Sequence, residues 1–109
     1  MAAICWNQVN FKHRKKEIAR LDACADANRL IEPLFPGDEH RFMRGFDSHT
    51  LEVIDETPMT RTFRFSTKGS PPIAFYEAMV AQGFSVMAFF WSPAWGQFGY
   101  WEKIGRAHV

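Results

Sequence analysis

Hydrophobic and polar residues alternate along several short segments, which is the pattern of strands with one buried face. In segment 4–11 one face carries Cys5, Asn7, Val9 and Phe11, and the other carries Trp6, Gln8 and Asn10. The same alternation predicts strands over residues 51–55, 60–67, 84–91 and 97–102, with turns at 56–58 and 92–96. In segment 60–67 we expect Phe63 and Phe65 to point toward the core.

Segment 17–25 has the spacing of an amphipathic helix, because Ile18, Leu21 and Ala25 recur three and four residues apart. The residues just before it are basic: Lys12, Arg14, Lys15 and Lys16. Positive charge at the amino-terminal end of a helix opposes the helix dipole and costs some stability. We therefore predict that this basic run contacts a partner, with a solvated turn as the alternative.

A second helix is predicted after residue 70. Ser70 is placed to cap its free amides, and Pro71 suits the first helical position. Gly83 is placed to end the helix in a left-handed turn, with Phe84 as the hydrophobic closure.

The order of these elements is strand, helix, strand, strand, helix, strand, followed by one further strand. This order predicts an α+β protein with a ferredoxin-like β-α-β-β-α-β split. We expect an antiparallel sheet with both helices on one face and an extra strand from a C-terminal hairpin. Residues 1–109 are expected to form one domain, with a frayed tail at 104–109.

The segment 29–49 has neither a helical nor a strand period, and a connection of this length is often functional. Arg41, Phe42 and Arg44 mix cations with an apolar ring, as interface loops do. We predict that they contact a partner. Residues 38–49 fit a loop or a short strand equally well.

Aromatic residues make up 16% of the chain, more than a core of this size needs. We predict that Trp91, Trp95, Phe98 and Trp101, around the C-terminal hairpin, form a partner-binding patch. The alternative is a small terminal core that shields the edge of the sheet.

The net charge of +1 excludes a chain that binds nucleic acid by its charge alone. RNA-recognition domains nevertheless share the predicted topology and stack bases on their central strands. On the sheet face without helices, Trp6, Gln8 and Arg64 are the candidate residues for binding nucleic acid. A register slip of one residue would add Phe63 and Phe65 to that face.

The sequence lacks the motifs of a catalytic, cofactor-binding or metal site, so we expect neither an enzyme nor a bound cofactor. Asp38, Glu39 and His40 form a single acid-histidine cluster, interpreted as a surface loop. Cys5 and Cys24 are expected to be buried thiols, with a Cys–His nucleophile as the alternative. They suit a reduced cytoplasm, and neither a signal peptide nor a membrane span is predicted.

Four segments resemble a known family. Its members open with an aromatic-Cys-Asn strand, like Cys5-Trp6-Asn7, and later carry an I-x-P-x-P segment, loosely matched by residues 31–36. Residues 65–72 are similar to its F-x-T-x-x-S-P-P junction, and residues 89–99 to its aromatic hairpin. The family is the YubB-type (Api-like) group of ferredoxin-like proteins carried by plasmids and phages. Gly69 departs from it, because many members carry Trp there.

The resemblance implies a ferredoxin-like fold and a mobile-element origin, and it carries over no activity and no catalytic residues. We therefore expect a non-enzymatic binding protein of a plasmid or phage, located in the cytoplasm of a bacterial host. Its expected partner is a host protein, such as a defence complex that it inhibits in the manner of an anti-CRISPR or other anti-defence protein. The alternative is a single-stranded nucleic-acid-binding domain. A homodimer through the open sheet face or the last strand is a further expectation.

Overall fold

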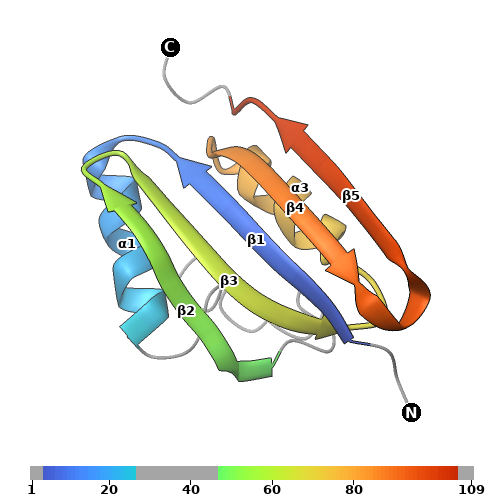
Figure 1. Ribbon diagram of the computed structural model, residues 1–109. Coiled ribbons are helices and arrows are strands. Elements are labelled where there is room, and N and C mark those ends of the chain that lie inside the picture. Colours follow the sequence, from blue (N-terminus) through green and yellow to red (C-terminus); the bar gives the residue numbers. More distant parts are fainter. Residues whose placement is uncertain (1–3, 27–46, 106–109) are drawn as a thin grey trace.

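The computed structural model describes residues 4–26 and 47–105, and in this part of the chain five strands form one sheet beside two helices (Figure 1). The elements in chain order are β1 (Ile4–Lys12), α1 (Lys15–Asp26), β2 (Asp47–Thr57), β3 (Thr60–Lys68), α3 (Ile73–Ala81), β4 (Ser85–Ser92), the 3₁₀ turn η1 (Pro93–Trp95) and β5 (Gln97–Lys103).

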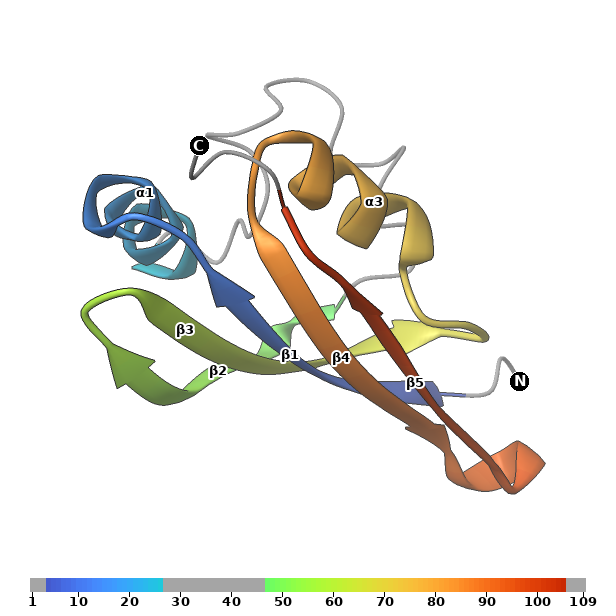
Figure 2. The same cartoon turned by 90° about the horizontal axis from the view of Figure 1, so that it is seen from above.

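The strand order across the sheet is β2-β3-β1-β4-β5, and every neighbouring pair is antiparallel. Both helices lie on the same face of this sheet, as the two orthogonal views show (Figures 1 and 2). The prediction of an α+β protein with an antiparallel sheet and two helices is therefore confirmed, and the arrangement is compatible with a ferredoxin-like fold.

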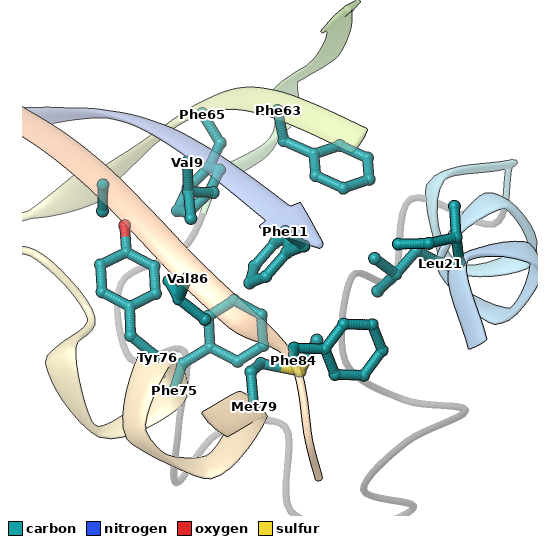
Figure 3. Close-up of a cluster of buried hydrophobic side chains, with 12 residues drawn as sticks. Val9, Phe11, Leu21, Phe63, Phe65, Phe75, Tyr76, Met79, Phe84 and Val86 are labelled. Atoms are coloured by element: carbon teal, nitrogen blue, oxygen red, sulfur yellow. The ribbon is translucent and has the colours of Figure 1, made fainter. Parts of the chain in front are cut away.

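The core lies between the sheet and the helices. In β1 the odd-numbered residues are buried and the even-numbered residues are more exposed, as the alternation predicts. Phe63 and Phe65 on β3 are fully buried, so the one-residue slip does not occur. Rings from β1, β3 and α3, together with Phe84 just before β4, fill the space that Figure 3 shows, among them Phe11 and Phe75.

Helix α1 packs on this core through Ile18 and Leu21, both of which are buried. On its polar side, the guanidinium of Arg61 on β3 donates two hydrogen bonds to the carboxylate of Asp22, at 2.6 and 2.9 Å. Such a two-point contact between a guanidinium and a carboxylate fixes orientation as well as distance. The amphipathic helix predicted over 17–25 is thus confirmed and is joined to the sheet on two sides.

The start of α3 differs from the prediction. Pro72, and not Ser70, is the residue that precedes the first helical turn, and no side chain in the described part of the chain caps it. Ser70 lies in a tight turn, where its amide donates to the carbonyl of Lys68 and its own carbonyl accepts from the hydroxyl of Thr67. Because Pro71 precedes another proline, its backbone is disfavoured in the helical region. The helix therefore begins two residues later than the Ser-Pro pattern predicts.

The end of α3 follows the prediction. Gly83 has a left-handed φ of +94°. The amide of Gly83 donates to the carbonyl of Val80 at 2.9 Å, and the amide of Phe84 donates to the carbonyl of Met79 at 3.1 Å. These two bonds are the Schellman motif, and the buried Phe84 ring closes the helix end.

Strand β2 is longer than predicted. Glu56 pairs with Arg61 and Thr57 with Thr60, so both residues belong to the strand and the turn lies at 58–59. The strand begins at Asp47, which places residues 47–49 of the undecided segment 38–49 in a strand. The rest of that segment lies outside the described residues.

The geometry of Gly83 leads to a prediction on stability. We expect Gly83→Ala to lower the free energy of unfolding by about 1–2 kcal/mol, because a Cβ is unfavourable in the left-handed region. Gly83→Asn is the matched variant and should lose less, because asparagine tolerates this conformation better. Urea unfolding followed by circular dichroism measures both, and an unchanged midpoint for Gly83→Ala would contradict the assignment.

Candidate interaction surface

The sheet face opposite the helices carries side chains that the strand pairing arranges in three crosswise rows. We call this surface the open face. From β3 to β5, the first row is Ser66, Trp6, Trp91 and Phe98, the second is Arg64, Gln8, Phe89 and Tyr100, and the third is Thr62, Asn10, Met87 and Glu102.

Large apolar groups on the β4–β5 side of this face are exposed. The exposed fraction is 86% for Phe98 and about half for Tyr100 and Phe89, and Met87 is similar at 42%. The rings of Phe89 and Tyr100 contact each other at a centroid distance of 5.0 Å. Neighbouring exposed rings and a methionine are typical of an interaction surface.

The partner-binding residues predicted from the sequence do not include Phe89, Tyr100 and Met87. Segment 84–91 is apolar at nearly every position, so its buried face is ambiguous. The pairing of β4 with β1 settles it, because Phe89 lies opposite Gln8 and Ala88 opposite Val9. The alternation of 97–102 was the available signal, since it separates Tyr100 from Trp101.

The three residues predicted for nucleic acid lie together on this face. An Arg64 guanidinium nitrogen is 3.4 Å from the side-chain oxygen of Gln8, and another is 3.5 Å from the carboxylate of Glu52 on β2. Trp6 lies in the neighbouring row and is half-buried. Arg64 is thus held at the β2–β3 edge of the open face, across the sheet from Phe89.

The predicted hairpin patch is divided by the structure. Trp91 and Phe98 lie in the first row of the open face. Trp101 points to the helix side, where its ring contacts that of Tyr76 at a centroid distance of 5.7 Å and packs against the core. The side chain of Trp95 is outside the described part of the structure.

The predicted basic run lies where β1 ends and α1 begins, beyond the third row. Lys12, Arg14, Lys15 and Lys16 are all exposed there. The Arg41–Phe46 segment, with its predicted contacts Arg41, Phe42 and Arg44, is outside the described residues. The structure therefore brings Trp6, Gln8, Arg64, Trp91 and Phe98 onto one face and places the basic run at its end.

A buried polar cluster lies on the helix side of the sheet. The amide nitrogen of Asn7 donates to the hydroxyl of Thr67 at 3.0 Å and to the carbonyl of Cys5 at 3.2 Å. Burial raises the pKa of the Cys5 thiol, against a smaller opposite effect of the Thr67 hydrogen bond. A thiol held neutral is a weak nucleophile. The cluster therefore joins β1 to β3 in a form that does not activate Cys5.

The described residues contain neither a candidate metal centre nor a helix that could span a membrane. No group of three or more His, Cys, Asp or Glu side chains in residues 4–26 and 47–105 is placed to hold a metal ion. Neither helix of this part of the chain is long and apolar enough to cross a bilayer. The predicted surface loop with Asp38, Glu39 and His40 lies outside the described residues, as does the side chain of Cys24.

The Tyr76 hydroxyl beside this cluster leads to a prediction on pH dependence. It is buried and has no hydrogen-bond partner among the described residues, and burial, with a smaller effect of Cys5, raises its pKa. The folded protein therefore keeps this proton when the unfolded chain loses it, so stability falls as the pH rises above about 10. We expect Tyr76→Phe to be at least as stable at pH 7 and to lose less stability at pH 11.

Urea midpoints at the two pH values measure this difference. Tyr100→Phe is the matched control, because the exposed Tyr100 ring leaves Tyr76 in place and the alkaline loss should remain. A Tyr76→Phe variant that loses as much stability as the wild type between pH 7 and pH 11 would show that Tyr76 is not responsible.

Comparison of the chain with protein-family models, with curated proteins and with solved structures gives no match. The resemblance to the YubB-type family therefore stays a prediction, and the geometry of the open face is the basis for assigning a function.

Proposed function

We propose that this chain is a non-enzymatic binding protein that recognises a protein partner through the open face. The observation that supports this is the exposure of Phe89, Phe98, Tyr100 and Met87 beside one another on two paired strands. Aromatic residues, methionine and arginine are enriched in protein interfaces, and buried rings supply most of the binding energy there.

The charges of the open face favour a protein over a polyanion. By the strand register, the cations on this side are Lys12, Arg64 and Lys68, and the acids are Asp47, Glu52, Asp55 and Glu102. The acids outnumber the cations by one, and Glu52 contacts Arg64. A surface with apolar rings and no excess of positive charge suits another protein surface better than a row of phosphates.

The fold and the family resemblance extend this proposal to the architecture of the domain and to the kind of partner. We propose a single ferredoxin-like domain in which β5 is an added strand, since β2, β3, β1 and β4 follow one another across the sheet as the split requires. Through the resemblance, the partner is a host protein, such as a defence complex, in the bacterial cytoplasm. The mobile-element origin and the anti-defence role rest on that resemblance.

Affinity capture from bacterial lysate tests the proposal. The wild-type protein should retain a protein in stoichiometric amount, and Phe89→Ser/Phe98→Ser should retain at least tenfold less, because the exposed rings are lost. Val53→Ser is the matched control, because Val53 is a partly exposed apolar residue on β2 that lies opposite the core residue Phe63. Equal capture by the wild type and the double variant would refute the open face as the binding surface.

Single-stranded nucleic acid is the second candidate, and the position of Arg64 and Gln8 in the same row as Phe89 and Tyr100 favours it. Bases stack on exposed rings, and arginine adds a contact to phosphate or base. If nucleic acid is the true ligand, any protein captured from lysate would be bound through nucleic acid, and nuclease treatment would abolish the capture.

A titration with short single-stranded DNA and RNA separates the two candidates. If nucleic acid binds, tryptophan fluorescence should change at low salt, and the affinity should fall steeply as salt rises. Arg64→Ala and Phe89→Ser should each weaken binding, and Val53→Ser should not. Fluorescence that stays constant for both oligonucleotides at low salt would eliminate the nucleic-acid candidate.

A further inference from the structure

A pocket of about 490 Å³ lies at one end of the sheet, where β1 ends, β4 begins and β5 ends. Its walls come from these three strands, from the β2–β3 turn and from the residues that follow α3. The volume is within the range of pockets that hold small organic ligands. The pocket overlaps the open face at the third row, because Asn10, Met87 and Glu102 of that row line it.

The charged groups of the pocket are mainly cationic. Among the described residues, Lys12, Arg14 and Lys103 line it, and Glu102 is the one acid. The carboxylate of Glu102 accepts a hydrogen bond from the hydroxyl of Tyr100, which lies in the second row outside the pocket lining. The pocket therefore carries a net positive charge next to the start of α1, where the helix dipole adds to the positive potential.

The remaining lining is largely apolar. Met59, Met87 and Ile104 contribute to the walls, and their exposed fractions are 45%, 42% and 69%. Exposed apolar side chains around a concave site gain free energy when a ligand removes them from water. A ligand that is anionic at one end and apolar at the other matches both parts of the lining.

Hydrogen bonds hold the walls in place without a ligand. The amide of Arg14 donates to Nδ1 of His13 at 2.7 Å, and Nε2 of His13 lies 3.3 Å from the carbonyl of Gln82 after α3. The His13 ring also packs on Phe84 at a centroid distance of 4.7 Å. His13 thus ties the end of β1 to the end of α3, and a preformed pocket loses little entropy on binding.

We infer that this pocket binds an amphiphilic organic anion, a molecule with a carboxylate or phosphate head and a short apolar body. The head lies among Lys12, Arg14 and Lys103, and the apolar body lies against Met59, Met87 and Ile104. This site takes a small molecule, and it shares Met87 with the surface proposed for the protein partner but none of that surface's exposed rings.

The test uses octanoate and octyl phosphate as probes. Calorimetry measures their affinity for the whole protein, and amide shifts in NMR spectra locate the residues that they contact. At least one probe should bind and shift the amides around the pocket. Octylammonium, with the same chain and the opposite charge, should bind at least tenfold more weakly. Acetate, with a similar head and no chain, should also bind at least tenfold more weakly.

Variants of the lining complete the test. Lys12→Gln/Lys103→Gln should weaken binding of the better probe at least tenfold, and Lys68→Gln, at the opposite end of the sheet, should leave it unchanged. Phe89→Ser/Phe98→Ser should bind the probe like the wild type, so the result is independent of the partner proposal. The inference is overturned if neither probe binds, if octylammonium binds as tightly, or if the double lysine variant binds normally.

Discussion

The pairing of β1 with both β3 and β4 determines which side of the sheet every side chain occupies. Strand side chains alternate between faces, so a shift of one residue in either pairing would exchange the core and the surface. In the observed register Val9 lies between Phe63 and Ala88 in the core, and Gln8 lies between Arg64 and Phe89 on the open face. The core, the open face and the pocket at the strand ends all follow from these two registers.

Much of the fold is predictable from the sequence, because its signals are local. The alternation in β1 and the glycine at the end of α3 each act within a few residues, and the structure agrees with both. The start of α3 was misjudged because Pro71 and Pro72 constrain each other as well as the helix. The length of β2 was not predicted, because it depends on pairing with β3, and pairing is a contact between two segments rather than a local signal. The open face was only half predicted, since the side to which Phe89 points depends on that same kind of contact.

The two candidate binding regions differ in their physical character, although they meet at the third row. The first and second rows are broad, and their cation Arg64 contacts the carboxylate of Glu52, which suits a partner with a large surface of its own. The pocket is concave and cationic, which suits a small anion. Met87 lies in both regions, so a bound anion and a bound partner would share one side chain. The two kinds of binding are therefore placed to influence each other.

The exposure of Phe98 has a consequence for how this sequence changes over evolutionary time. A side chain with 86% of its surface in water contributes little to folding, so mutation to a polar residue costs the fold almost nothing. Phe11, which is fully buried, is retained by the demands of folding alone. Persistence of an aromatic residue at position 98 among diverging descendants of this chain would therefore record natural selection for binding, whereas persistence at position 11 would not.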